Sequence, residues 1–349
     1  MAETYYVGLD IHKKVVSYCV KRACGEVVDE GVVAARRQDL LRWARQLEGR
    51  WIGGMEATLF TGWIYDTLKP LAKELKVAHP AMLKAIAVGK NKSDRLDARK
   101  IADLTRCDLL VESYMPPPEV RQLRTVLRYR NLVVGQAVQI KNRIAGLLME
   151  TGTAYGSKKL HGQRYFRKLM SELEGVPDSV VQLLRLSRNT LESLQQLERQ
   201  LIRGLLGQPL LAQRVELLRT IPGVGIITGL TWALEIGEVS RIPSIGQGIS
   251  YCGLCQGQRE SAGKAQRGPI SKQRNKHLQR TLIEAAKLAP RSHPRLAAVY
   301  QKALGEGPAN RATIQVARKL VAYLLAVDRS GRPFQLAPEE LRTQVRGSF

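Results

Sequence analysis

Hydrophobic and polar positions alternate with two different periods along the first 115 residues of the chain. Apolar, β-rich runs bounded by turn residues predict strands at residues 4–10, 14–21, 25–34, 51–55 and 76–79. Apolar residues at helical spacing predict helices at residues 38–48, 59–75 and 93–107. The three early strands form a meander, and strands then alternate with helices. We therefore predict an α/β domain built on a mixed rather than a purely parallel sheet.

The pattern becomes predominantly helical after residues 115–118, whose sequence Met-Pro-Pro-Pro marks a domain boundary. Residues 119–150 are helical and strongly basic, whereas residues 151–177 are polar and have no clear period. Residues 180–205 carry apolar side chains at six of eight heptad core positions. This predicts a helical hairpin or coiled coil able to pair subunits, or else an ordinary amphipathic helix packed within its own chain. The predicted division is a domain at 1–115, a helical or coiled-coil region at 116–206 and a mostly helical domain at 207–349.

The charge of the chain indicates a polyanionic partner. It has 55 Lys and Arg against 31 Asp and Glu, a formal net charge of +24. The longest charge-free apolar stretch has 15 residues, 220–234, whereas a membrane-spanning helix needs roughly 20. Five cysteines and an N-terminus without a basic-then-apolar signal pattern favour a cytoplasmic protein. Only 19 residues are aromatic, so we expect contacts with phosphate backbones rather than stacking on unpaired bases.

Four carboxylates occupy positions that a metal-binding or catalytic role explains better than a role in solubility. Asp10 and Glu56 each end an apolar strand, and Asp94 and Asp97 lie three residues apart at the start of a helix. At about 100° per residue, both helix acids share the apolar side, while the neighbouring arginines face water. Burying like charges is costly unless cations compensate them, and a pair of Mg²⁺ ions bound by carboxylate oxygens would do so. Two such ions can activate a nucleophile and stabilise the leaving oxygen of a phosphodiester.

Each carboxylate also has an ordinary explanation. Asp94 could complement the dipole of a helix capped by Ser93. Asp10 could initiate a turn, and Glu56 could be an acid at a helix N-terminus. The joint arrangement, rather than any one residue, favours metal binding.

Two features of the third region could contact nucleic acid. Gly223 and Gly225 lie in a segment, residues 217–228, with the form of a helix-hairpin-helix, whose glycines let the backbone approach phosphate. The alternative is a tight turn between helices without a ligand. Residues 256–280 carry one acid, Glu260, against seven cations: Arg259, Lys264, Arg267, Lys272, Arg274, Lys276 and Arg280. A run of this kind is either a nucleic-acid contact or a solvated loop.

The motifs resemble those of a known family, the DEDD transposases of the insertion-sequence 110 family. The N-terminal resemblance rests on Gly8-x-Asp10, Met55-Glu56-Ala57-Thr58 and Lys92-Ser93-Asp94-x-x-Asp97-Ala98. The C-terminal resemblance rests on Gly253-Leu254, Glu260-Ser261-Ala262-Gly263 and Arg267-Gly268-Pro269-Ile270-Ser271-Lys272. The resemblance covers nearly the whole chain.

The resemblance implies an RNase H-like, RuvC-like N-terminal domain in which Asp10, Glu56, Asp94 and Asp97 bind Mg²⁺. It also implies that a serine of the C-terminal domain attacks a DNA phosphodiester. Ser261 takes that place, and Ser271 is the fallback, although it is better interpreted as a helix cap. A structured guide RNA (a bridge RNA) encoded by the element, double-stranded DNA of element and target, and a homodimer or tetramer are the implied partners.

Three functions follow from these residues. The first is a DNA recombinase that forms a phosphoserine link, which conserves the energy of the broken bond for rejoining. The second is a hydrolytic nuclease of the junction-resolving type, in which water replaces Ser261 as the nucleophile. The third is a non-catalytic RNA- or DNA-binding protein whose acids are structural.

Overall fold

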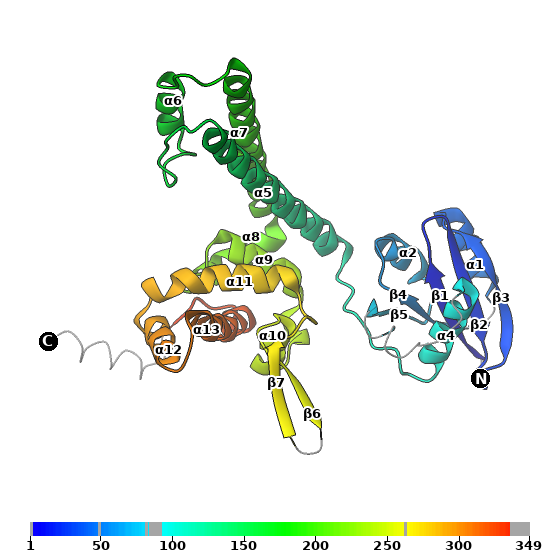
Figure 1. Ribbon diagram of the computed structural model, residues 1–349. Coiled ribbons are helices and arrows are strands. Elements are labelled where there is room, and N and C mark those ends of the chain that lie inside the picture. The colour runs from blue at the N-terminus through cyan, green and yellow to red at the C-terminus, as the bar shows by residue number, and fades with distance from the viewer. Residues whose placement is uncertain (1–2, 48–49, 81–82, 84–92, 262–263, 336–349) are drawn as a thin grey trace. The chain divides into compact units, whose positions relative to one another are not determined.

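The computed structural model describes residues 3–47, 50–80, 83, 93–261 and 264–335, without the side chains of residues 258–261, 264–267 and 269 (Figure 1). The chain divides into two compact units, Met1–Pro118 and Glu119–Phe349. Each unit has its own hydrophobic core.

The first unit is built on a five-stranded sheet with the order β3-β2-β1-β4-β5. The strands are β1 (Thr4–Ile11), β2 (Val15–Lys21), β3 (Val27–Ala34), β4 (Arg50–Glu56) and β5 (Glu74–Ala78). The pairs β1–β2 and β2–β3 are antiparallel, whereas β1–β4 and β4–β5 are parallel. The mixed sheet predicted from the sequence is confirmed.

Helices cover both faces of this sheet. Helices α1 (Arg37–Gln46) and α2 (Thr61–Leu68) pack on the face that carries Leu9, and α4 (Asp94–Arg106) packs on the face that carries Gly8. The prediction of one helix over residues 59–75 is wrong, because α2 already ends at Leu68. Pro70 lacks the backbone donor that a continuing helix needs, and the chain turns there before β5 begins.

Helix α4 approaches the sheet closely because two glycines leave room for it. A Cβ atom on Gly8 would overlap the backbone of Ala98 and Ala102, and one on Gly54 would overlap the Thr105 hydroxyl. Contact at this distance sets the position of the whole helix, including its first turn.

Replacing Gly8 by alanine should therefore destabilise the first unit. The added methyl meets backbone atoms, which cannot swing aside as a side chain can, so we expect a loss of about 3 kcal/mol in the free energy of unfolding. Urea unfolding followed by tryptophan fluorescence measures it. Gly146→Ala is the control, since Gly146 has open space around it in helix α5 (Pro118–Glu150) and should be neutral or stabilising. Equal stability of Gly8→Ala and the parent would contradict the close packing.

The second unit begins with three helices that share a core: α5, α6 (Gln163–Ser171) and α7 (Asp178–Leu206). Leu184 and Leu191 of the heptad segment are buried against residues of α5 and α6 in the same chain. The heptad leucines thus pack intramolecularly. Helix α6 was not predicted, because its nine residues contribute only Phe166 and Leu169 to the buried core.

The rest of the second unit is a helical domain with one β-hairpin. Its elements are α8 (Pro209–Arg219), α9 (Ile226–Ile236), η1 (Val239–Arg241), α10 (Ile245–Tyr251), β6 (Gln256–Ser261), β7 (Lys264–Ile270), α11 (Lys276–Leu288), η2 (Ala289–Arg291), α12 (Pro294–Gly305) and α13 (Ala309–Ser330). Helix α9 is central, since every residue from Thr228 to Ile236 is buried. The helical character agrees with the prediction, but the hairpin was not foreseen. Within the described ranges, none of the helices is both long and apolar enough to cross a membrane.

Candidate functional site

The parallel pairing of β1 and β4 brings two of the predicted acids to one edge of the sheet. Leu9 pairs with Met55, so Asp10 and Glu56 are the next residues along each strand. Because side chains alternate between faces, both project on the α4 face. Asp10 is nearly buried, at 9 % exposed. The backbone oxygen of Glu56 accepts a hydrogen bond from Thr61 Oγ1 at 3.0 Å, which ties the end of β4 to α2.

The other two predicted acids lie in the first turn of α4, and this turn lies over the same edge of the sheet. Ser93 caps this helix by accepting a hydrogen bond from the backbone nitrogen of Leu96 at 3.3 Å, as predicted. Asp94 is exposed and Asp97 is half-buried. Asp97 lies one turn before Ile101, which packs near Gly54 of β4, so Asp97 projects on the β4 side of the helix.

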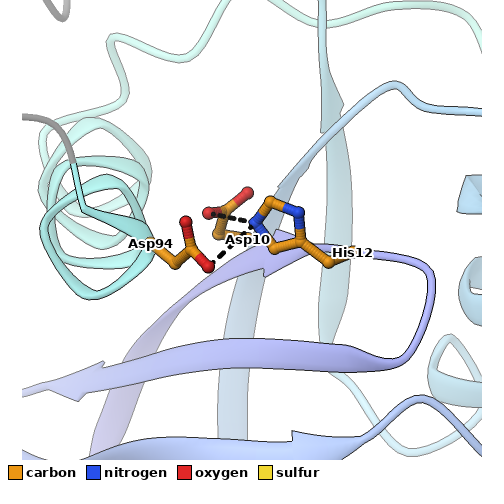
Figure 2. A group of neighbouring side chains, drawn as sticks. All are labelled: Asp10, His12 and Asp94. Atoms are coloured by element: carbon orange, nitrogen blue, oxygen red, sulfur yellow. Dashed lines mark hydrogen bonds and ion pairs between the residues drawn. The ribbon is translucent and has the colours of Figure 1, made fainter.

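A histidine that the sequence analysis did not single out joins two of these acids. Nε2 of His12 lies 3.1 Å from Oδ2 of Asp10 and 3.3 Å from Oδ2 of Asp94 (Figure 2). Among the described residues, these three form the one group that could hold a metal ion, with ligand atoms within 4.8 Å of one another. Its sequence signal was weak, because β1 ends at Ile11 and His12 lies in the turn that follows.

The electrostatics of Asp10 reflect this crowding of acids. Burial raises the pKa of Asp10 above its usual value, the hydrogen bond and charge of His12 oppose this rise, and the charges of Asp94 and Asp97 add to it. Thus Asp97 acts on Asp10 although it is outside the three-residue group. Its own carboxylate lies 3.4 Å from Nζ of Lys100. A divalent cation at this edge would favour the ionised form of Asp10.

The arginines of α4 do not simply face water, contrary to the prediction. Nε and Nη2 of Arg99 donate to the carboxylate of Glu30 on β3 at 2.6 Å each, and Arg95 also pairs with Glu30. Arg106 donates to the backbone oxygen of Ala23 at 3.1 Å. Helical periodicity separates the two sides of α4 correctly, but it cannot show that β3 supplies a partner. These contacts anchor α4 across the sheet.

The segment that carries Ser261 is the β6–β7 hairpin rather than a loop. Ser261 is the last residue of β6, and its backbone pairs in register with Lys264. Four predicted residues, Ser261, Arg259, Lys264 and Arg267, have side chains outside the described part of the structure. Lys272 and Arg274 follow the hairpin and are exposed.

Ser271 does not cap helix α11, which corrects the prediction. Its hydroxyl accepts a hydrogen bond from the backbone nitrogen of Gln273 at 3.2 Å, in a turn that precedes the helix. Asn275 is the cap, because its side chain accepts from the backbone nitrogens of His277 and Leu278. A serine four residues before the cap is too early to reach the first helical amides.

The glycine turn between α8 and α9 borders a basic groove. Gly223 has φ +84° and is packed against Ala289, so a side chain there would be strained and would clash. Gly225 precedes α9 as a cap residue without a side chain. The groove has a volume of about 750 Å³, and none of its lining residues is Phe, Tyr or Trp. Residues of the glycine turn, α5 and α11 line it, including Arg128, Arg130, Lys276 and Arg280.

Comparisons with known proteins match both candidate regions. The model of the Transposase IS116/IS110/IS902 family matches residues 215–301, and a second model, described as Transposase, matches residues 7–152. The chain is 24% identical to the putative transposase y4qE of Sinorhizobium fredii over 94% of this chain and 89% of that protein. It is 28% identical to the transposase for insertion sequence element IS1328 of Yersinia enterocolitica, over 68% of this chain and 70% of that protein. It is 26% identical to the transposase for insertion sequence element IS1111A of Coxiella burnetii, over 82% and 78% of the two chains.

Proposed function

The chain belongs to the IS116/IS110/IS902 family of transposases, and from that premise we propose that it cuts and rejoins DNA at an insertion sequence with Mg²⁺ and a serine nucleophile. Membership of the family implies DNA binding and the use of a divalent metal ion. The observation that carries the proposal is the convergence of Asp10, His12 and Asp94 at the sheet edge, beside Glu56 and Asp97.

The first unit supports an RNase H-like, RuvC-like catalytic domain. Its strand order of 3-2-1-4-5, with an antiparallel meander followed by two parallel strands, suits that fold. The acids come from the ends of β1 and β4 and from the first turn of α4. In this proposal residues 1–115 are the catalytic domain, residues 116–206 are the helical region and residues 207–349 are the C-terminal transposase domain.

The residues at the sheet edge fit a Mg²⁺ site. Mg²⁺ prefers carboxylate oxygens, and Asp10, Glu56, Asp94 and Asp97 would hold the ions. Once bound, the ions would activate the attacking hydroxyl and stabilise the leaving oxygen. His12 is within hydrogen-bonding distance of both Asp10 and Asp94, so it would keep their oxygens oriented toward the ions.

Ser261 would supply the nucleophile. Its Oγ attacks the phosphorus of a DNA phosphodiester and loses its proton, an Oγ–P bond forms, and one P–O bond to deoxyribose breaks. The leaving oxygen takes up a proton and becomes a free hydroxyl end. One ester replaces another, so a DNA hydroxyl can later attack the phosphoserine and rejoin the strands without ATP.

The cations and glycines of the second unit would bind phosphate backbones. Gly223, Gly225 and Lys276 border the groove, and Lys276 is exposed. In this proposal the basic residues around the hairpin add further contacts: Arg259, Lys264, Arg267, Lys272 and Arg274. The groove has no Phe, Tyr or Trp, which favours backbone contacts over base stacking. Sequence choice would then come from a structured guide RNA, and two DNA partners would suit a homodimer or tetramer.

A recombination assay tests the proposed function. The protein is purified with the RNA that accompanies it and is mixed with element-end DNA, target DNA and Mg²⁺. We expect a joined product that is lost after either chelation of the metal or RNase treatment. Cleaved ends without any joined product would favour the hydrolytic nuclease, and DNA binding without cleavage would favour the non-catalytic protein.

A further inference from the structure

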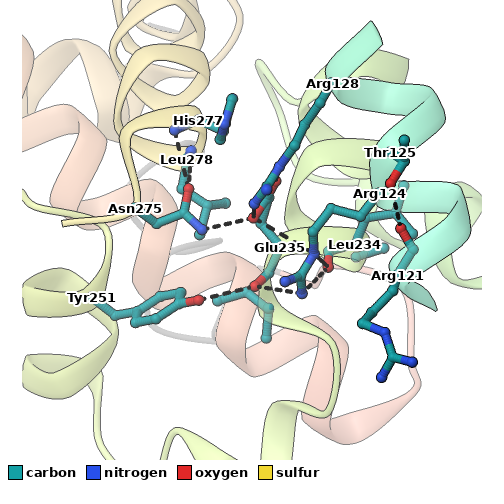
Figure 3. A network of polar contacts seen from close by, with 12 residues as sticks. Arg121, Arg124, Thr125, Arg128, Leu234, Glu235, Tyr251, Asn275, His277 and Leu278 are labelled. Carbon is teal, nitrogen blue, oxygen red and sulfur yellow. Dashed lines mark hydrogen bonds and ion pairs between the residues drawn. The ribbon is translucent and has the colours of Figure 1, made fainter. Parts of the chain in front are cut away.

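One carboxylate in the second unit is completely buried among charged and polar partners. The side chain of Glu235 on α9 is 0% exposed. Nε and Nη2 of Arg128 each donate to one of its oxygens at 2.9 Å, and Nδ2 of Asn275 donates to Oε2 at 2.8 Å (Figure 3). Nε of Arg124 lies 3.7 Å from Oε2. Burial alone would raise the pKa of Glu235, but the hydrogen bonds and charges of Arg128, Asn275 and Arg124 outweigh it and lower the pKa.

The same residue holds both ends of the segment that contains the β6–β7 hairpin. Tyr251, the last residue of α10, donates its hydroxyl to the backbone oxygen of Glu235 at 3.2 Å. Asn275, which binds the Glu235 carboxylate, also donates its backbone nitrogen to the backbone oxygen of Tyr251 at 3.0 Å. Residues 252–274 therefore leave and re-enter the domain at two positions that are bonded to each other and to Glu235.

The partners of Glu235 on the other side belong to the helix that follows the first unit. Arg124 and Arg128 lie within the first three turns of α5, which starts at Pro118, where the first unit ends. Arg124 also donates to the backbone oxygen of Leu234 at 3.0 Å and 2.7 Å. Glu235 thus links the helix that leads out of the metal-binding unit with the base of the hairpin that carries Ser261.

Stability alone is a poor explanation for this network. The Glu235 carboxylate is fully removed from water and the Arg124 side chain is only 14% exposed, whereas the Arg128 side chain is 46% exposed. Burying charged groups costs free energy, and apolar residues of similar size often replace buried ion pairs without loss. What a charged, bidentate network supplies is a defined geometry between the elements that it joins. Direct contact with DNA is excluded by the complete burial of the Glu235 side chain.

We propose that Glu235 is a positioning residue for the transposase reaction, which fixes the base of the β6–β7 hairpin on α5 so that Ser261 is presented to the scissile phosphate. This inference rests on the proposed function, in which Ser261 is the nucleophile. Glu235 itself touches neither DNA nor the metal ions in this mechanism.

The test uses the full-length protein with its RNA and compares Glu235→Gln with Glu216→Gln. Glutamine keeps the size of Glu235 but replaces one acceptor oxygen by a donor, which must face Arg128 or Asn275. Glu216 is an exposed glutamate on α8 that pairs with Arg219, so its variant removes the same charge from the surface. Two quantities are measured: the single-turnover rate of the protein–DNA adduct at saturating DNA, and the hydrogen exchange of backbone amides in residues 252–274.

For Glu235→Gln we expect the adduct rate to fall at least about tenfold with an unchanged Kd for DNA, and exchange in residues 252–274 to rise by a similar factor while α13 stays protected. Glu216→Gln should match the parent. Arg128→Lys keeps the charge but loses the bidentate geometry. Like Glu235→Gln, it should lower the adduct rate and raise the exchange, and it takes the place of Glu235→Gln in the test if that variant does not fold. Unchanged exchange, an unchanged adduct rate, or a loss confined to Kd would overturn the proposal. Absence of an adduct with the parent protein would instead refute the proposed function, and the exchange data would still test the anchoring by Glu235.

Discussion

Asp10→Asn is expected to abolish metal-dependent DNA cleavage, with a loss of about 10³-fold or more in rate, while DNA binding stays unchanged. Asp10 is the acid at the end of β1 that His12 connects to Asp94, and it is the most buried of the predicted metal ligands. An amide keeps the shape but brings no negative charge, so it binds Mg²⁺ far more weakly. DNA binding should persist because the cations of the second unit are untouched. Strand cleavage and gel-shift assays at equal Mg²⁺ concentration measure the two effects.

The same substitution should leave the protein folded or make it slightly more stable. The folded-state pKa of Asp10 is raised above the ordinary value of an aspartate, chiefly by burial. A raised pKa means that the ionised carboxylate costs folding free energy, and this cost develops as the pH rises from the unfolded to the folded pKa. At neutral pH the cost is fully present, and asparagine removes it. Thermal unfolding should therefore give a Tm at neutral pH at or above that of the parent.

Asp39→Asn is the matched control for Asp10→Asn. Asp39 lies in the first turn of α1 in the same unit, and its carboxylate is 3.6 Å from Arg42. Its variant should cleave DNA at the parental rate. Cleavage by Asp10→Asn at a rate close to the parent would show that the acids at this sheet edge are structural.

Local patterns were sufficient to predict the sheet and the positions of the candidate metal ligands on it. The strands are short apolar runs between turn residues, and Asp10 and Glu56 follow from the ends of two of them. The first turn of α4 could be predicted because Ser93 caps it and the apolar positions behind it keep helical spacing. These signals lie within a few residues of each other, which is the range over which periodicity carries information.

Partners that are distant in the chain were not predictable in the same way. Glu30 binds arginines of α4 from 65 and 69 residues away, and Glu235 binds Arg128 from 107 residues away. Glu235 directly follows the charge-free apolar stretch 220–234 and Glu30 is half-buried, but neither sequence context shows which arginines bind these glutamates. His12 was missed for another reason: it follows the strand in a turn, where histidine is unremarkable until α4 brings Asp94 beside it.

The β6–β7 hairpin was missed because its strands lack the usual alternation. Residues 256–261 read Gln-Gly-Gln-Arg-Glu-Ser and contain no apolar side chain. Such a strand has no apolar face in its sequence, so it resembles a loop, and only pairing with β7 makes it extended. For a segment proposed to contact phosphates, polar side chains on both faces are an advantage.

Ser261→Ala is expected to eliminate the covalent protein–DNA adduct completely. If Ser261 Oγ is the atom that bonds to phosphorus, alanine leaves no atom that can form the ester, whatever the geometry of the metal site. Joined product should vanish with the adduct, whereas Kd for DNA should change little because the substitution removes no charge. Denaturing gel electrophoresis of labelled DNA after incubation with Mg²⁺ reveals the adduct as a band that protease treatment removes.

Ser271→Ala separates the two serines of this segment. The Ser271 hydroxyl accepts a hydrogen bond from Gln273 in the turn before α11, so its loss should leave the adduct in place and reduce its yield only modestly. An adduct that disappears with Ser271→Ala and persists with Ser261→Ala would transfer the nucleophile to Ser271. An adduct that persists in both variants would exclude both serines, and cleavage without any adduct in the parent would identify water as the nucleophile. An ester formed at the end of β6 requires that the adduct is lost with Ser261→Ala and retained with Ser271→Ala. The two variants separate these positions because the turn that holds Ser271 lies at the opposite end of the hairpin.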